Sequence, residues 1–165
     1  MHDPIVAFYR GGRAAGRTVD EILGWDDERL EMVHDYIQWL FPLREPSGVN
    51  PSAPLVSGET INAFTRDAAL RARLGTALDR MLVFYGLQRR AARIETDPAR
   101  FPRRSRIWLH PGNHNHLRLT RIMRSLAALG LREDALALQR CLLEDVYALH
   151  PRQISDVTVR FWRWR

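Results

Sequence analysis

The sequence predicts an all-α protein, a single compact bundle of about six to seven helices with one long proline-rich loop and one arginine-rich loop. Apolar residues recur every three or four positions over most of the chain, which is the helical period. Capping residues precede several of these stretches, and glycines follow two of them. A length of 165 residues is typical of one domain with one core, so we expect residues 1–165 to form a single domain.

The first two helices are predicted from their caps. Thr18 and Glu21 have the spacing of a capping box, which starts a short helix over 19–24. Asp26 is the expected N-cap of a second helix, which runs to about residue 40. One face of this second helix carries apolar residues at 3-4-3 spacing: Leu30, Val33, Ile37 and Leu40. Pro42 ends the helix, because its ring disfavours helical geometry at the preceding residue.

A proline-rich loop follows this helix and contains Pro42, Pro46, Pro51 and Pro54. The bulky Trp39 and Phe41 stand just before the loop and need a cover. Prolines reduce the entropy that a loop loses on ordering, so we expect the loop to fold back over Trp39 and Phe41. The alternative is that the segment forms the rim of a ligand pocket with an aromatic floor and few polar groups. The residues of that rim are His34, Gln38, Trp39, Arg44 and Glu45.

The next helices have clear starts and stops. Ser57 caps a short helix, and Asp67 caps a longer one that reaches Tyr85. Gly86 then provides a left-handed C-terminal stop, and Gly130 does the same for a helix over 114–129.

Three later segments are predicted with different patterns. Residues 88–112 contain three prolines and seven arginines and are expected to be irregular. The helix over 133–149 is apolar on two faces, which makes it the expected central and most buried helix. The tail 154–165 fits a weak strand or a last helix capped by Ser155, and we favour the helix.

Composition excludes several classes of protein. Cys141 is the only cysteine, so no disulfide forms within the chain, and a reducing compartment is expected. The sequence shows neither a signal peptide nor an apolar run long enough to cross a bilayer, so we expect a soluble, cytoplasmic protein. Every basic side chain except histidine is arginine, which indicates a GC-rich, bacterial genome. The absence of lysine excludes Schiff-base and P-loop chemistry.

Arginines gather on one face of the predicted helix 114–129. Arg118, Arg121 and Arg124 lie opposite its apolar stripe, and no acidic residue occurs between positions 98 and 132. One interpretation is that these arginines dock against the acidic segment 20–35 or are simply solvated. The other is an anion site near the helix start, which would also include His114 and Asn115.

Nucleic-acid binding is the alternative function that the charge pattern suggests. Residues 61–165 carry a formal charge of +11, whereas residues 1–60 carry −5. Arginines in the loop 89–106 would contact phosphates, and tail tryptophans would stack on bases. The residues concerned are Arg89, Arg90, Arg103, Arg104, Arg106, Trp162 and Trp164.

No catalytic or metal-binding pattern stands out. His110, His114 and His116 are close in sequence, but no cysteine or carboxylate accompanies them and two histidines at i and i+2 do not share a helix face. The glycines of "YRGGRAAGRT" lack the spacing of a phosphate-binding loop. We therefore expect no metal, no cofactor and no enzymatic activity.

Three blocks of the sequence carry a family resemblance: "HDYIQWLFPLREP" (34–46), "MLVFYGL" (81–87) and "NHNHLRLTRIMRSLAALGL" (113–131). In this order, they resemble the conserved N-terminal domain of the opioid growth factor receptor family, from about Phe8 to Tyr147. The "YIQWLFP" core is the most specific part.

The resemblance implies a helical domain that is unrelated to seven-helix opioid receptors. For the vertebrate member it implies binding of an enkephalin pentapeptide, nuclear or nuclear-envelope association and restraint of growth. Carried onto this chain by its motifs, the resemblance concerns His34, Tyr36, Gln38, Trp39, Arg44, Glu45, His114, Asn115, Arg118 and Arg121. His116 stands where the vertebrate motif has an amide side chain. The expected function is thus that of a non-enzymatic domain that binds a short peptide or an anionic ligand.

Overall fold

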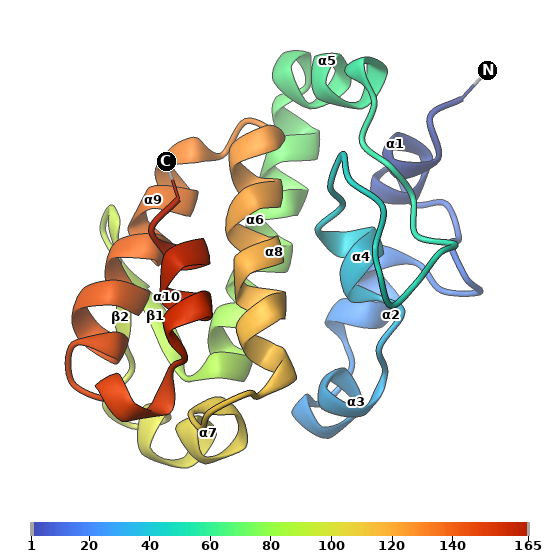
Figure 1. The fold of residues 1–165 in the computed structure, drawn as a ribbon. Helices are drawn as coiled ribbons and strands as arrows, with labels where there is room; N and C mark the ends of the chain where they lie inside the picture. The colour runs from blue at the N-terminus through green and yellow to red at the C-terminus, as the bar shows by residue number, and fades with distance from the viewer. Residues whose placement is uncertain (1, 165) are drawn as a thin grey trace.

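The computed structural model describes residues 2–164, and most of them are helical (Figure 1). Ten α-helices form in these residues, more than the six to seven expected, because one predicted helix is divided in two and two short ones were not foreseen. The first seven are α1 (Pro4–Tyr9), α2 (Val19–Leu23), α3 (Asp27–Met32), α4 (Ile37–Leu40), α5 (Gly58–Arg66), α6 (Ala68–Tyr85) and α7 (Phe101–Trp108). The rest are α8 (His114–Ala128), α9 (Arg132–Arg140) and α10 (Asp156–Trp162), with a π-helix η1 (Cys141–Tyr147) and a 3₁₀ turn η2 (Pro151–Gln153).

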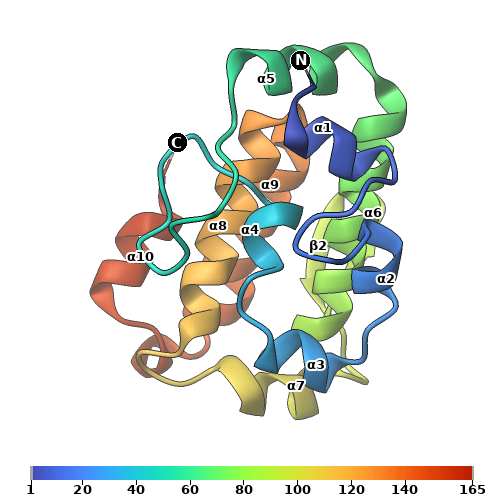
Figure 2. The same ribbon diagram turned by 90° about the vertical axis from the view of Figure 1, so that its right-hand side faces the viewer.

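The long helices α6 and α8 both run through the middle of the fold (Figures 1 and 2). The N-terminal elements α1 to α4 cover one side of this pair. The other side is covered by α9, η1 and α10, while α7 lies across one end. One continuous cluster of buried apolar side chains joins both sides, with Tyr9, Phe64 and Trp108 among its largest members.

The all-α prediction is wrong for residues 87–96. Strands β1 (Leu87–Arg90) and β2 (Arg93–Thr96) form a two-stranded antiparallel sheet, in register Leu87 to Thr96. The hairpin turns at Ala91, whose φ of 54° is left-handed. Glycine or asparagine normally marks such a turn, so an alanine gives little signal in the sequence.

The middle of the remaining arginine-rich segment is also not irregular, because residues 101–108 form α7, whereas residues 97–100 and 109–112 are irregular as predicted. Pro102 occupies the first turn of that helix, where its missing N–H has no helical partner to lose. The proline therefore favours the start of a helix where the sequence predicts an irregular segment.

The predicted helix from Asp26 to Leu40 is divided in two. Asp26 caps α3 as expected, accepting a 2.8 Å hydrogen bond from the backbone N–H of Arg29. Val33, however, is extended, and helical geometry resumes only at Ile37. This break leaves backbone carbonyl oxygens without helical hydrogen-bond donors. Side chains described below donate to them instead.

The proline-rich loop is closed at its base. Leu43 and Leu55 form an isolated parallel bridge, with the N–H of Val56 donating to the carbonyl oxygen of Leu43 at 2.9 Å. Phe41 is fully buried. The cover expected over Trp39 comes in part from α1, because its ring lies 5.5 Å from that of Phe8.

The predicted helix 133–149 forms as α9 followed by η1, but it is not the most buried one. Leu136 and Leu149 on its surface are 41% and 72% exposed, whereas α6 and α8 have buried residues along most of their length. The favoured helix in the tail is confirmed as α10, whose cap Ser155 accepts from the N–H of Thr158. Position 165 of that prediction lies outside the described residues.

Candidate functional site

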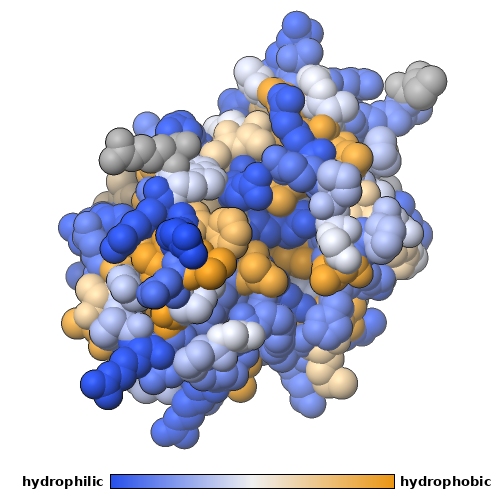
Figure 3. All heavy atoms as spheres, in the orientation of Figure 1, coloured by the Kyte–Doolittle hydropathy of each residue, from blue (hydrophilic) through white to orange (hydrophobic). Residues whose placement is uncertain are grey.

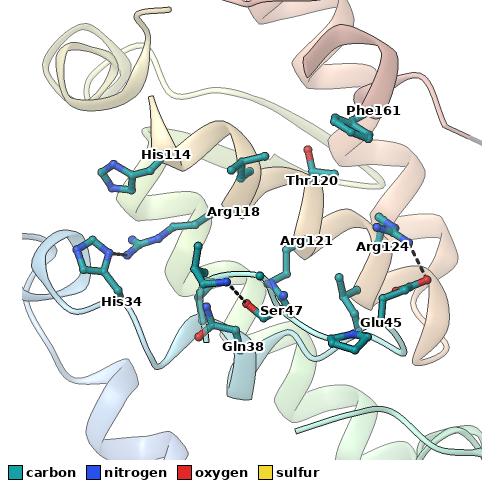
Figure 4. A pocket seen from close by; sticks show the side chains of 16 residues that line it. His34, Gln38, Glu45, Ser47, His114, Arg118, Thr120, Arg121, Arg124 and Phe161 are labelled. Carbon is teal, nitrogen blue, oxygen red and sulfur yellow. Dashed lines mark hydrogen bonds and ion pairs between the residues drawn. The ribbon is translucent and has the colours of Figure 1, made fainter. Parts of the chain in front are cut away.

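A cavity of about 610 Å³ lies between α8 and the first part of the proline-rich loop (Figure 4). Its lining comes from five places: the break before α4, α4 itself, the loop, α8 and α10. The lining residues are His34, Ile37, Gln38, Leu43, Glu45, Pro46, Ser47, Gly48, Val49, His114, Leu117, Arg118, Thr120, Arg121, Arg124 and Phe161. The two sequence blocks 34–46 and 113–131 thus meet in space and enclose a hollow between them.

Three arginines, spaced three residues apart along α8, join these two blocks. Arg118 contacts the break after α3, Arg121 donates to the carbonyl oxygen of Phe41 at 3.2 Å, and Arg124 pairs with Glu45 at 3.0 Å. Three residues advance a helix by about 4.5 Å. The arginines therefore contact the earlier segment in order along its length. Figure 4 shows the two ends of this row, with Arg118 beside His34 and Arg124 beside Glu45.

Arg118 is the buried member of the row and holds the break in place. Its guanidinium donates to the carbonyl oxygens of Leu30 and Val33, each at 2.9 Å. Tyr36 donates its hydroxyl to the same Leu30 oxygen at 2.7 Å, and burial raises the pKa of Tyr36 to about 12, so the hydroxyl keeps its proton. His34 Nδ1 lies 3.3 Å from Arg118 and accepts, because a guanidinium has no acceptor.

The expected docking of the arginine face on the acidic segment 20–35 is observed for Arg118, and it uses backbone carbonyl groups. Arg121 contacts Phe41, which lies outside that segment. Neither Arg118 nor Arg121 forms an ion pair with a carboxylate of residues 2–164. Arg124 is the one of the three that does, and its partner Glu45 lies outside the acidic segment.

Arg121 has the greatest capacity for a further ligand. One of its N–H groups is bonded to Phe41, and within residues 2–164 its other N–H groups have no acceptor. Burial lowers the pKa of Arg121, with a smaller contribution from the neighbouring charge of Arg124. Both effects disfavour an unpaired cation, so an anion placed here would be stabilised.

A histidine pair stands beside Arg118 at one end of the cavity. The rings of His34 and His114 are 5.7 Å apart, and His114 Nε2 lies 2.6 Å from Glu31 Oε1. Asn115 fixes the other oxygen of Glu31 with a 3.0 Å hydrogen bond. Burial lowers the pKa of His114 although Glu31 opposes the shift, which favours the neutral ring.

The lining has a positive charge and a large apolar area. It holds three arginines and one glutamate, a formal charge of +2 with the histidines neutral. The apolar part is formed by Ile37, Leu43, Pro46, Val49, Leu117 and Phe161. On the side of the molecule that Figure 3 shows, apolar residues are exposed near the middle. An apolar concave surface with a few charged groups is the usual form of a small-ligand site.

The structure brings together six of the nine predicted ligand-binding residues: His34, Gln38, Glu45, His114, Arg118 and Arg121. The other three do not line the cavity. Trp39 packs on Phe8 and is not among the residues that line the cavity. Arg44 is exposed to solvent. Asn115 is buried and accepts from the hydroxyl of Tyr85 at 3.3 Å.

Sequence reasoning missed the six apolar residues that line the site, and Leu117 is one that could have been found. Leu117 shares a helix face with Thr120, Arg121 and Arg124, at spacings of three, four and seven residues. Phe161 gives no such signal, because it reaches the cavity from a helix more than 30 positions away.

The predicted nucleic-acid residues are largely used within the fold. Arg89 pairs with Asp134 at 2.7 Å, and Arg104 donates to the carbonyl oxygen of Phe84 at 2.7 Å. Arg90 pairs with Glu95 at 3.2 Å. Arg103 and Arg106 are exposed on α7.

The two tryptophans of that prediction differ in their exposure. Trp162 is fully buried, so its predicted role is wrong. Trp164 is partly buried, and the guanidinium of Arg132 lies 6.0 Å from the centre of its ring.

The clustered histidines have separate partners. His110 contacts the carbonyl oxygen of Ile107, whereas His116 is buried and donates to that of Trp108 at 2.7 Å. Within residues 2–164 no group of three or more histidine, cysteine or acidic side chains has a geometry that could hold a metal ion. None of the described helices is both long enough and apolar enough to cross a membrane.

Comparisons with known proteins agree with the sequence blocks. The family described as the opioid growth factor receptor (OGFr) conserved region matches residues 15–162. The mouse opioid growth factor receptor is 39% identical over 144 residues, which cover 82% of this chain and 22% of that protein. The human receptor is 36% identical over 154 residues, covering 86% and 22%.

A second group of relatives is also similar. The opioid growth factor receptor-like protein 1 of Xenopus tropicalis is 35% identical over 138 residues, covering 79% of this chain and 26% of that protein. The chain thus spans about a quarter of the length of these relatives. No solved structure matches it. The match covers both blocks that form the cavity, and the chain belongs to the opioid growth factor receptor family.

Proposed function

We propose that this protein is a non-enzymatic binding domain that takes a short peptide or another ligand with an anionic group into the cavity between α8 and the loop 43–49. The observation that carries the proposal is Arg121, a partly buried guanidinium without a carboxylate partner in residues 2–164, on the wall of a cavity of about 610 Å³. A charge-assisted, two-point hydrogen bond to a ligand carboxylate would use the free N–H groups.

Two further features support this proposal. The cavity carries a net charge of +2, which attracts an anion, and its apolar part provides contact area for the rest of a ligand. The curated relatives are named receptors, which is in keeping with a binding role. The proposed role is binding alone and requires no catalytic side chain.

The test is to measure dissociation constants by isothermal titration calorimetry with short peptides in two forms. One form has a free C-terminal carboxylate and the other a C-terminal amide. We expect the carboxylate form to bind more tightly, and Arg121→Gln to weaken it at least about tenfold, since a hydrogen bond to a charged group contributes roughly 1.5–3 kcal/mol. Arg103→Gln is the matched control, because it removes the same charge from an exposed position on α7 outside the cavity. Equal weakening by both variants would indicate only a general charge effect and reject the site.

A further inference from the structure

We infer that the cavity binds an amphipathic carboxylate, that is, a carboxylate joined to an apolar group several atoms away. This inference rests on the proposed function and adds to it the chemistry of the ligand's other half. The carboxylate would bond to Arg121, and the apolar group would lie against Leu117, Phe161 and Val49 at the mouth.

The apolar half is indicated by three side chains that are exposed around one opening. Val49 is 84% exposed, Leu117 is 63% exposed and Phe161 is 48% exposed. They belong to the loop, α8 and α10, and all three line the cavity. A single exposed leucine needs no explanation, but apolar side chains from three elements around one concave site are typical of a surface that binds an apolar group.

The distance between the two halves follows from the helix. Leu117 and Arg121 are four residues apart on α8, so they lie on the same face with a rise of about 6 Å between them. A ligand that contacts both must therefore join its anionic and apolar groups through a short chain. An inorganic anion has no apolar group and cannot use this wall.

The charged groups favour a single carboxylate over a dianion. Arg118 already donates to two carbonyl oxygens, and Arg124 already pairs with Glu45. Arg121 thus offers a guanidinium with unused donors and, unlike Arg124, no carboxylate partner within the described residues. A planar carboxylate matches one such edge with two parallel hydrogen bonds.

The experiment compares straight-chain carboxylates of graded length, namely acetate, butanoate, hexanoate and octanoate, by isothermal titration at one pH and ionic strength. We expect the dissociation constant to fall by up to roughly fourfold for each CH₂ group that becomes buried. Octanol and octylammonium have the same chain without the negative charge and should bind at least tenfold more weakly than octanoate. Inorganic phosphate should bind no better than acetate.

Two further ligands show whether the amphipathic carboxylate is a peptide C-terminus or an alkyl carboxylate. N-acetyl-Gly-Leu and N-acetyl-Gly-Gly present a peptide carboxylate with and without an apolar side chain. A preference for the leucine peptide together with no chain-length effect among alkyl carboxylates would support the inference and assign the ligand to peptide C-termini. A chain-length effect without a leucine preference would support it and assign the ligand to alkyl carboxylates.

Variants locate the apolar wall. Leu117→Gln and Phe161→Gln should each reduce the ratio of octanoate to acetate affinity by about tenfold, with little change for acetate itself. Leu136→Gln, on α9, removes a leucine that is 41% exposed and outside the cavity, so it should leave the ratio unchanged. Circular dichroism and urea unfolding would show that each variant is folded.

The outcomes separate the two claims. Binding that depends on Arg121 but is equal for acetate, octanoate and both peptides would overturn the amphipathic ligand and leave the proposed function standing. If no anion binds in a way that depends on Arg121, the proposed function itself fails. A chain-length effect that persists unchanged in Leu117→Gln and Phe161→Gln would overturn the assignment to this wall.

Discussion

Arg118 of α8 donates a 2.9 Å hydrogen bond to the carbonyl oxygen of Leu30, 88 positions earlier in the chain. A second N–H group of the same guanidinium reaches the carbonyl oxygen of Val33 at the same distance. These contacts satisfy backbone groups that the end of α3 leaves without helical partners. One side chain thus holds together the helix end, the break and the wall of the cavity.

Replacement of Arg118 should therefore destabilise the fold. Arg118→Met keeps much of the apolar stem but removes the charged donor from the carbonyl oxygens of Leu30 and Val33, of which only Leu30 keeps a second donor, Tyr36. A polar group left unsatisfied costs about 1–3 kcal/mol, and the packing of the guanidinium on the Tyr36 ring is also lost. We expect a loss of about 3 kcal/mol in the free energy of unfolding, measured by urea titration. Arg124→Met removes an exposed pair with Glu45 and should cost less than about 1 kcal/mol. Similar losses for the two variants would contradict this account.

Stability should fall on mild acidification because of His116. The ring is 2% exposed, its Nε2 donates to the carbonyl oxygen of Trp108, and its Nδ1 has no partner within residues 2–164. Burial lowers the pKa of His116, so below the ordinary value of about 6.5 the unfolded chain binds a proton more readily than the folded one. The stability present above that pH is lost as the pH falls through it.

The measurement is the midpoint of thermal unfolding between pH 8 and pH 5. His116→Gln keeps a side-chain N–H group but cannot be protonated, so it should flatten the decline in part. His114, whose pKa is also lowered, accounts for a remaining slope. A decline of the same size in His116→Gln would assign the effect to other groups.

Two glycines with similar backbone angles should respond differently to alanine. Gly86 has φ +79°, and an added Cβ would lie 2.8 Å from the Cα of Phe101; Gly112 has φ +74° and open space around it. Gly112→Ala should lower the free energy of unfolding by about 1 kcal/mol, which is the cost of the left-handed conformation for alanine. Gly86→Ala adds a backbone clash and should cost about 3 kcal/mol in urea unfolding. Equal costs would mean that the contact between Gly86 and α7 is readily relaxed.

Cys141 should report global opening of the protein. The thiol is fully buried, and burial raises its pKa to about 12, so almost no reactive thiolate is present at pH 8. We expect a colorimetric thiol reagent to label the native protein at the rate of unfolding and the urea-unfolded chain within seconds to minutes. Because Cys141 is the only cysteine, no other thiol contributes. Rapid labelling of the native protein would show local opening around η1.

The short-range features of this fold were readable in the sequence. Caps, helical periodicity and glycine stops predicted α6 and α8, as well as the cap of α3 at Asp26, because each depends on residues within a turn or two. The same reasoning found most of the charged side of the candidate site. The arginine face of α8 and the block around His34 and Gln38 carry their polar groups in visible patterns.

Only the tertiary structure decided which of these groups face one another. The helix predicted through Val33 breaks there, because Arg118, far along the chain, and the nearby Tyr36 supply donors for the carbonyl groups that the break releases. The aromatic wall of the cavity is Phe161 from α10 and not Trp39, whose ring turns to Phe8. A local sequence pattern indicates which side chains can be buried or paired. The partner is chosen by packing between elements that lie far apart in the chain, and periodicity holds no information about that choice.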